Sequence, residues 1–253
     1  MKTVTISGAN KDIGKSSLAA YIIGHCLVCA AAKFSLHAQA PEGPAIVPEG
    51  PDGDPASDTA RMYRAGARPV YWVRSTEEAL PADIARTLES MDSSVAVLEG
   101  NSILQHLAPD FAIFIMNPTF DDFKPSAWEA LKRADVVLVN GDTAVSGEEA
   151  LRLEHLCKVR NPRLKILFSA DRGREAAWNI ILSRIVGKLG GDYFLEETDA
   201  RIAEELQKRA KDGRIPCGVA LKLAEELGVS TQKVGETANQ LKLKIINCSL
   251  GCF

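Results

Sequence analysis

Short apolar runs alternate with longer segments of mixed polarity along most of the chain. The runs are nearly continuous in hydrophobicity and rich in β-branched residues, which is typical of strands buried on both faces of a parallel sheet. The segments between them are long enough to form helical crossovers. The pattern therefore predicts an α/β fold, with a doubly wound, mostly parallel sheet and helices on both faces. The predicted strands are TVTIS (3–7), KFSLHA (33–38), PVYWVR (69–74), VAVLEG (95–100), FAIFIM (111–116), DVVLVN (135–140) and KILFSA (165–170).

One apolar stretch, from Ser17 to Ala32, carries no charge. It is shorter than the roughly 20 residues that cross a bilayer, so we interpret it as a buried helix. Cys26 and Cys29 would then share one helix face as small core residues. A metal site at a dimer seam, with His25 nearby, is the alternative. No export leader precedes the first strand, which predicts a cytoplasmic protein without membrane association.

Residues 39–57 are rich in proline and glycine and have neither helical nor alternating periodicity. Such a segment predicts a long surface loop. It follows the second predicted strand, near the sheet edge where ligands bind in folds of this class. We therefore expect the loop to be functional.

The pattern changes after about residue 200, where short helical segments follow one another without another strong strand. This predicts two domains, residues 1–198 and 199–253, the second small and helical. Residues 219–245 have helix-turn-helix spacing, with Ala224 inside the first helix, Gly228 at the turn and Val234 in the second helix. From residue 201 to residue 244 there are nine Lys or Arg against six Asp or Glu, but the second helix carries only Lys233 against Glu236. A packing or interaction module is at least as well supported as a DNA reader.

The overall composition is that of an ordinary soluble protein. The chain has 253 residues, 46% of them hydrophobic and 25% charged, with a formal net charge of -3. This balance provides no general attraction to nucleic acid or to an anionic membrane. Binding partners must therefore be inferred from local motifs.

The most specific motif is ANKDIGKS, residues 9–16, which follows a predicted strand and opens a predicted helix. This is the context of a Walker A loop, in which backbone N–H groups and a helix N-terminus face phosphates. Lys15 would reach the β- and γ-phosphates and Ser16 would ligate Mg²⁺. The first motif position holds Ala9 instead of glycine, although Gly8 precedes it. Asn10 occupies the position of the extra lysine in the deviant ParA and MinD type of loop, which disfavours that subclass.

Two carboxylates are candidates for the magnesium site. Glu99 ends a buried strand, where a Walker B acid is expected, and Asp58 opens the segment after the long loop. Glu99 could equally be a surface acid at a strand end, and Asp58 could bind the magnesium ion or its water. Arg61, Arg64 and Arg68 follow at roughly helical spacing and could meet phosphate or an anionic substrate, although a solvated helix face explains them as well.

Base recognition has weaker candidates. Asn140 and Asp142 follow one predicted strand, and Ser169 and Ala170 follow the next, in positions similar to the N-K-x-D and S-A-K elements of GTPases. A carboxylate at Asp142 could accept both N–H groups of guanine, which favours GTP over ATP. Both pairs could also be turn chemistry. The residues predicted to contact nucleotide are Ala9, Asn10, Lys11, Asp12, Ile13, Gly14, Lys15, Ser16, Ser17, Asn140 and Asp142.

Three cysteines near the C-terminus form a further candidate site. Cys217, Cys248 and Cys252 could converge on a thiolate-bound metal or an Fe–S cluster, because soft thiolates select such ions. A fourth ligand would be needed, and chance spacing in a poorly ordered tail is the alternative. In a reducing compartment free thiols or ligands are expected instead of disulfides.

With these motifs together, residues 1 to about 195 resemble molybdopterin-guanine dinucleotide biosynthesis protein B (MobB) and related P-loop proteins. The resemblance rests on ANKDIGKSSL, KFSLHA, DTARMYRAGAR, the LEG around Glu99, and VLVNGD. It implies that Lys15 and Ser16 hold nucleotide and Mg²⁺, with Asp58 and Glu99 near the metal. It also implies a homodimer that serves molybdenum or tungsten cofactor assembly. The proline-rich insertion and the C-terminal domain depart from that family.

The sequence thus predicts a P-loop protein that binds or hydrolyses GTP or ATP with Mg²⁺ during maturation of a metal cofactor or a metalloenzyme client. It identifies no catalytic base. One alternative is a P-loop kinase that phosphorylates a small molecule, which product analysis would reveal. Another is a nucleotide- or metal-responsive DNA-binding regulator, which salt-dependent DNA affinity would reveal.

Overall fold

The computed structural model describes residues 1–50, 53–119, 123–141, 144–169, 174–195, 197–227 and 229–247. Five residues singled out in the sequence, Asp142, Ala170, Gly228, Cys248 and Cys252, lie outside these ranges.

The described residues form one large sheet of eight strands in the order β3-β4-β2-β5-β1-β6-β7-β8. Every neighbouring pair is parallel except β3 and β4, which are antiparallel at the edge of the sheet. Strands β5, β2, β4 and β3 lie on one side of β1, and β6, β7 and β8 lie on the other, so the sheet is doubly wound as predicted. The strands are β1 (Lys2–Gly8), β2 (Cys29–Leu36), β3 (Ile46–Pro48), β4 (Val70–Ser75), β5 (Val95–Glu99), β6 (Phe111–Met116), β7 (Val136–Asn140) and β8 (Lys165–Ser169).

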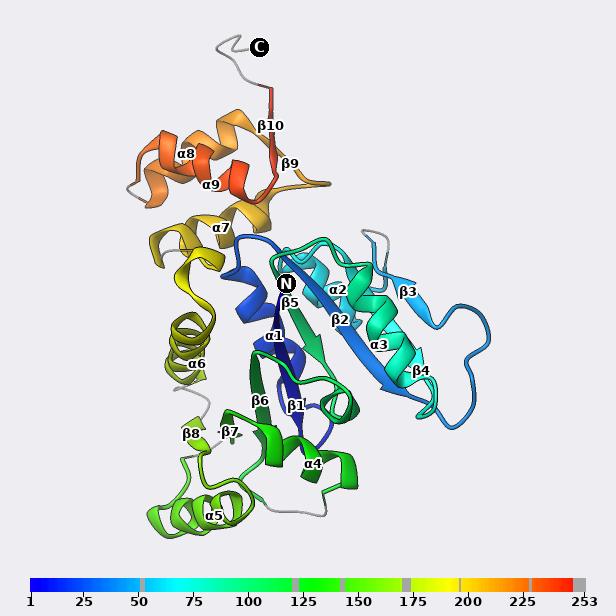
Figure 1. Ribbon diagram of the computed structural model, residues 1–253. Helices are drawn as coiled ribbons and strands as arrows, with labels where there is room; N and C mark the ends of the chain where they lie inside the picture. The colour runs from blue at the N-terminus through cyan, green and yellow to red at the C-terminus, as the bar shows by residue number, and fades with distance from the viewer. Residues whose placement is uncertain are drawn as a thin grey trace.

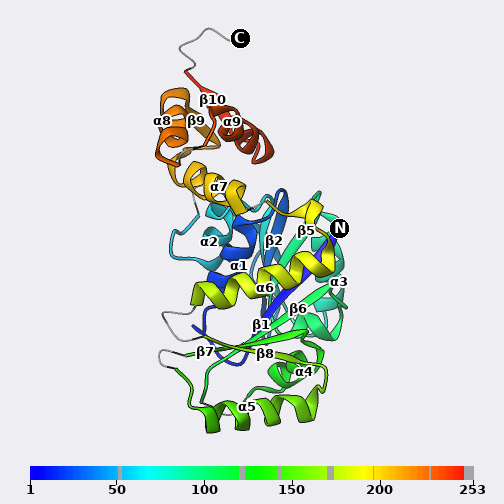
Figure 2. The same cartoon turned by 90° about the vertical axis from the view of Figure 1, so that its left-hand side faces the viewer.

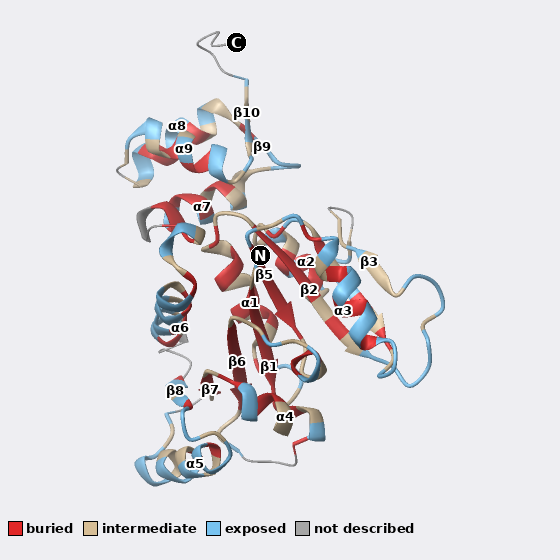
Figure 3. Ribbon diagram, viewed as in Figure 1, coloured by how far each residue is buried: buried red, intermediate tan, exposed pale blue. Residues whose placement is uncertain are grey.

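Helices cover both faces of the sheet (Figures 1 and 2). One hydrophobic core joins the sheet to α1, α2 and α6, and the other joins it to α3, α4, α5 and the short 3₁₀ helix η1. The central strands are therefore buried on both faces (Figure 3). These helices are α1 (Lys15–Gly24), α2 (Asp58–Arg64), α3 (Leu80–Glu89), η1 (Ser102–Gln105), α4 (Pro125–Arg133), α5 (Gly147–Arg160) and α6 (Arg174–Leu189). No helix in the described ranges is long and apolar enough to cross a membrane.

The predicted helix from Ser17 to Ala32 is wrong in its second half. Helix α1 ends at Gly24, and β2 begins at Cys29 and not at Lys33. The alanines after Cys29 favour a helix locally, but their small side chains also fit a central strand that is covered on both faces. Tertiary packing decides between the two, because β2 pairs with β4 and β5.

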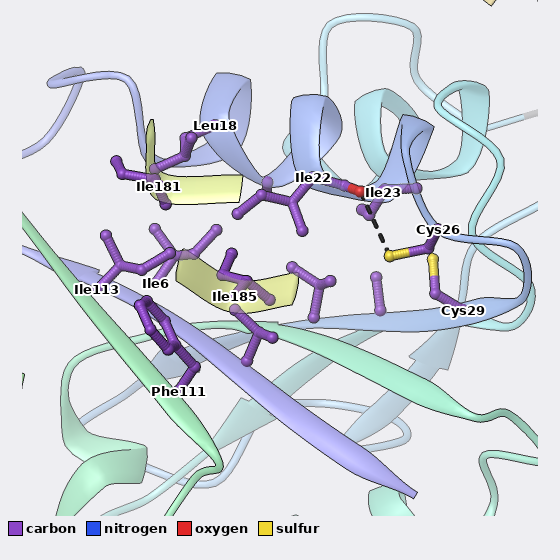
Figure 4. Close-up of a cluster of buried hydrophobic side chains, with 14 of the residues drawn as sticks. Ile6, Leu18, Ile22, Ile23, Cys26, Cys29, Phe111, Ile113, Ile181 and Ile185 are labelled. Atoms are coloured by element: carbon purple, nitrogen blue, oxygen red, sulfur yellow. Dashed lines mark hydrogen bonds between the residues drawn. The ribbon is translucent and has the colours of Figure 1, made fainter. Parts of the chain in front are cut away.

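Cys26 and Cys29 therefore do not share a helix face. Cys26 follows α1, where its Sγ donates to the Ile22 carbonyl oxygen at 3.3 Å, and Cys29 starts β2. Both thiols are buried and lie side by side in the core against α1 and α6 (Figure 4). A hydrogen bond with Cys29, together with burial, raises the pKa of Cys26. The geometry supports their interpretation as core residues.

Residues 39–57 do not form a single uninterrupted loop. Residues 46–48 form β3, which pairs with β4 through Val47 opposite Trp72. The Arg74 guanidinium donates to the carbonyl oxygens of Glu42 and Pro44, at 3.3 and 3.0 Å. The segment before β3 is thus attached to the edge of the sheet.

The C-terminal helices form a separate small core. Helices α7 (Glu197–Arg209), α8 (Cys217–Leu227) and α9 (Thr231–Gln240) pack around buried residues that include Leu206, Leu223 and Val234. Strands β9 (Arg214–Pro216) and β10 (Lys244–Ile246) pair in parallel, an addition to the predicted all-helical unit. We call these three helices and two strands the C-terminal module. A second short 3₁₀ helix, η3 (Gly191–Tyr193), precedes it.

The C-terminal module joins the main sheet at the C-terminal end of α1. Cys26 forms a bridge with Phe194, and the backbone N–H of Leu195 donates to the His25 carbonyl oxygen at 2.8 Å. Leu195, Ala200 and Ala203 form a small apolar cluster with Leu27. Both views place α7, α8 and α9 beyond the edge of the sheet where β1 begins (Figures 1 and 2).

Enlarging a fully buried alanine of β2 should destabilise the protein. Ala31 is 0% exposed between β4 and β5, so we expect Ala31→Leu to lower the free energy of unfolding by about 1–3 kcal/mol through overpacking. The measurement is urea unfolding followed by circular dichroism. Ala176→Leu on the exposed face of α6 is the control and should change stability by less than about 0.5 kcal/mol. Equal effects of the two substitutions would contradict the central position of β2.

Candidate functional site

A tight loop connects β1 to α1 at the C-terminal end of the central strand. Gly14 lies just before α1 with φ of 93°, a conformation that favours glycine. A Cβ atom on Gly8 would lie 2.5 Å from Ile13 Cδ1 and 2.8 Å from the Ile115 carbonyl oxygen, so this position also requires glycine. The loop thus folds back on the end of β1 and presents the first turn of α1, which is the arrangement that binds phosphate.

Side chains from two neighbouring strand ends hold the loop in place. The Asn101 carboxamide accepts from the Gly8 N–H and donates to the Gly8 carbonyl oxygen, both at 2.9 Å. On the other side, Asn140 Nδ2 donates to the Ile13 carbonyl oxygen at 2.9 Å. Sequence reasoning missed Asn101, which directly follows the predicted LEG motif. These contacts fix both ends of the loop.

Lys15 extends back along the loop from the first residue of α1. Its Nζ donates to the Asn10 carbonyl oxygen at 2.6 Å. Burial lowers the pKa of Lys15, an effect that Lys33 increases and the carboxylates of Glu99, Asp58 and Asp12 partly offset. An ammonium that has lost water in this way gains from a nearby anion, as a phosphate would provide.

Ser16 lies beside both candidate carboxylates. Its Oγ donates to Glu99 Oε2 at 2.7 Å, and the same side chain lies close enough to Asp58 to help lower the pKa of that carboxyl. Glu99 ends β5 and is 3% exposed, whereas Asp58 begins α2 after the capping residue Ser57. The fold therefore brings together three residues that are far apart in the sequence.

The two carboxylates have opposite pKa shifts. Burial raises the pKa of Glu99, and the Lys33 charge and the Ser16 hydrogen bond offset this only in part. Burial also disfavours ionised Asp58, but hydrogen bonds from Lys33 and Ser16, with the charges of Lys33 and Arg61, outweigh it and lower its pKa. Asp58 is therefore the carboxylate that stays ionised to lower pH.

Two cations complete the site. Lys33 on β2 donates to Asp58 Oδ2, and its Nζ lies 3.9 Å from Glu99 Oε1. Sequence reasoning missed Lys33, and its only sequence signal is a charge inside an apolar strand. Arg61 on α2 donates to Ser17 Oγ at 2.8 Å, beside the loop.

The other two arginines of this segment have different partners. Arg64 donates to the carbonyl oxygens of Ala60 and Pro55, and Arg68 lies over the Tyr63 ring. The predicted arginine face thus does not act as a unit. In the observed arrangement Arg61 is the member that reaches the loop.

The residues present suit a magnesium-bound nucleotide. A hydroxyl and two carboxylates are the hard oxygen donors that Mg²⁺ prefers. The three positive side chains, Lys15, Lys33 and Arg61, outnumber the two carboxylates, which favours binding of an anion. Asn140 lies against the loop, and Ser169 is buried at the end of the adjacent β8. Asp142, the predicted partner of Asn140 in base recognition, and Ala170, the predicted partner of Ser169, lie outside the described residues.

The cysteine site is only partly described. Cys217 is the first residue of α8 and is partly buried, in the C-terminal module at the opposite end of α1 from the loop. Its predicted partners Cys248 and Cys252 lie outside the described residues. In the ranges that the structure covers, no group of three or more His, Cys, Asp or Glu side chains is arranged to hold a metal ion.

Comparison with known proteins identifies the fold. No protein-family model matches the sequence, and no curated protein matches it. Among solved structures, hydrogenase maturation factor HypB from Archaeoglobus fulgidus is 16% identical with a TM-score of 0.51, over 75% of this chain and 91% of that chain. HypB from Helicobacter pylori in complex with nickel is 12% identical with a TM-score of 0.51, over 78% of this chain and 91% of that chain. The chain therefore has the P-loop NTPase fold.

Removal of the Ser16 hydroxyl should destabilise the protein even without a ligand. Ser16→Ala leaves the buried Glu99 carboxylate without its 2.7 Å donor, so we expect the free energy of unfolding to fall by about 1–3 kcal/mol at pH 7. Because the pKa of Glu99 is raised, this loss of unfolding free energy should depend on pH. It should become smaller as the pH falls through that pKa, since a protonated carboxyl needs the donor less.

The measurement is chemical unfolding from pH 8 down to the lowest pH at which wild type remains folded. Ser17→Ala is the matched control, since Ser17 is the next residue of α1 and bonds to Arg61 near the surface. A loss that is the same at all pH values would show that Glu99 is not the group that depends on Ser16.

Proposed function

We propose that this chain is a P-loop NTPase that binds and hydrolyses GTP or ATP with Mg²⁺ and acts in the maturation of a metalloenzyme or metal cofactor. The observation that carries the nucleotide part is the convergence of Lys15, Ser16, Asp58 and Glu99 at the end of β1. Four elements, α1, α2, β2 and β5, provide the charged and polar groups of this site.

Each residue has a role that follows from its chemistry. Lys15 and the N-terminal N–H groups of α1 bind the phosphates. Ser16, Asp58 and Glu99 hold Mg²⁺, whose bound charge would stabilise the negative charge that develops on the phosphates. Arg61, beside Ser17, adds a second positive group on the open side of the loop.

GTP is the expected nucleotide. Asn140 is tethered to the loop at Ile13, and Asp142, two residues further along the chain, offers a carboxylate that would accept both N–H groups of a guanine base. In the proposal Asn140 holds the loop and Asp142 reads the base.

The maturation role rests on two similarities. One of the similar structures is a hydrogenase maturation factor and another is a HypB in complex with nickel. The motifs of this sequence resemble those of MobB, which implies a molybdenum or tungsten cofactor. The role that both similarities support is assistance to a metal site in another protein.

The C-terminal module provides the contact with the client in this proposal. It lies at the opposite end of α1 from the loop, so nucleotide state and module are joined by one ten-residue helix. Cys217, Cys248 and Cys252 would bind a metal or Fe–S cluster there. We also propose a homodimer that forms through the nucleotide-bearing faces.

Loss of the Lys15 ammonium should abolish tight nucleotide binding. We expect Lys15→Ala to weaken GTP affinity by about 10- to 100-fold, because a charge-assisted contact to phosphate is lost in a partly desolvated site. Calorimetric titration with GTP and with ATP, each with Mg²⁺, gives the measurement. Lys132→Ala on α4 removes an equal charge from an exposed pair with Glu129 and should leave the affinity unchanged. A Lys15→Ala protein that binds as tightly as wild type would refute the nucleotide site.

A thiolate metal site predicts bound metal that depends on the terminal cysteines. Protein purified without oxygen should contain stoichiometric metal, and Cys248→Ser/Cys252→Ser should lose it while keeping nucleotide affinity. Elemental analysis of both proteins is the measurement. Cys157→Ser is the control, since Cys157 is a fully buried residue of α5. Metal that persists in the double variant would rule out these ligands.

A further inference from the structure

The lysine of β2 has an unusual neighbourhood. Lys33 lies opposite Glu99 of β5 and opposite Trp72 of β4 in the parallel register. Side chains at the same level of adjacent strands point to the same face of a sheet. Lys33 and Glu99 therefore both point toward the face that α1 and α2 cover, where Asp58 begins α2.

The ammonium of Lys33 lies between the two carboxylates that are proposed to hold Mg²⁺. It bonds to Asp58 Oδ2 and lies 3.9 Å from Glu99 Oε1, while Ser16 occupies the other oxygen of Glu99. The exposed fractions of the side chains are 27% for Lys33, 33% for Asp58 and 4% for Glu99. A carboxylate as buried as Glu99 needs a counter-charge, and Lys33 provides it.

The same oxygens cannot serve both cations fully. An ammonium and a divalent ion in contact with the same carboxylate pair repel each other, and the repulsion is strong where water is partly excluded. Phosphate groups change this balance, because they bring negative charge that an ammonium displaced from the carboxylates can approach. The arrangement therefore links the binding of metal to the binding of nucleotide.

We propose that Lys33 is the resident counter-ion of the Asp58 and Glu99 pair, and that it competes with Mg²⁺ so that the ion binds tightly only together with nucleotide. Lys33 is thus a positioning residue that determines when the site accepts its metal. The inference rests on the proposed nucleotide function.

The test measures Mg²⁺ binding to nucleotide-free protein by calorimetry. Wild type should bind Mg²⁺ weakly, and Lys33→Met, which keeps the aliphatic stem, should bind it at least about tenfold more tightly. Lys2→Met is the matched control: Lys2 is also a strand lysine, paired at 3.1 Å with Asp110, whose side chain is 33% exposed like that of Asp58. This control should leave the Mg²⁺ affinity unchanged.

Two further variants separate charge from packing. Lys33→Arg keeps the positive charge and should retain weak Mg²⁺ binding. Lys33→Met leaves Asp58 without its cation, whereas Lys33→Met/Asp58→Asn removes both partners of the pair. In EDTA, the double variant should therefore melt at a temperature closer to that of wild type than Lys33→Met does. An Mg²⁺ affinity that rises as much in Lys33→Arg as in Lys33→Met would overturn the inference.

Titration of wild type with GTP and Mg²⁺ distinguishes the two levels of the argument. If wild type binds no GTP or ATP, the proposed function fails and the inference fails with it. If wild type binds nucleotide with Mg²⁺ but Lys33→Met binds free Mg²⁺ no more tightly than wild type, the inference about Lys33 alone is wrong. If Lys33→Met binds Mg²⁺ tenfold more tightly than wild type without nucleotide, and this difference becomes smaller when GTP is present, both the proposed function and the inference about Lys33 are supported.

Discussion

Burial of the Glu99 carboxylate is the constraint on which the candidate site depends. Strand β5 pairs in parallel with β1 and β2, and Glu99 is its last residue. The Glu99 side chain is therefore at the C-terminal end of the central strands, buried beside α1. A buried carboxylate must be hydrogen-bonded and compensated in charge, and here Ser16 donates while Lys33 supplies the charge. Lys33 in turn bonds to Asp58, so one electrostatic requirement connects α1, α2, β2 and β5.

The loop between β1 and α1 is held in place by side chains from other strand ends. Its ends are held by hydrogen bonds with Asn101, which lies just beyond β5, and with Asn140, the last residue of β7. Glycines stand where the backbone needs a positive φ or where a side chain would meet β6. These contacts within the protein hold the loop in shape, which lowers the cost of ordering it on binding.

Helix α1 connects this site with the rest of the chain. Its N-terminus forms the loop, and the residues just after its C-terminus contact the segment that leads into the C-terminal module. Along its length the helix packs in one core with the sheet and α6. The loop and the C-terminal module therefore lie at opposite ends of one helix.

The sequence by itself determined the fold class, the loop and most strands. Short, continuous apolar runs are typical of strands in a sheet that is covered on both faces. A strand followed by a glycine-containing turn and a Lys-Ser pair is the pattern of a Walker A loop. It failed where local preference is weak: the alanines of β2 favour a helix alone, and only pairing with β4 and β5 makes them a strand. The tertiary structure also decided that Lys33 and Asn101 belong to the site and that Arg64 and Arg68 point elsewhere. These facts depend on which distant segments of the chain meet. Burial and charge compensation act through space, so the spacing of residues along the chain does not reveal them.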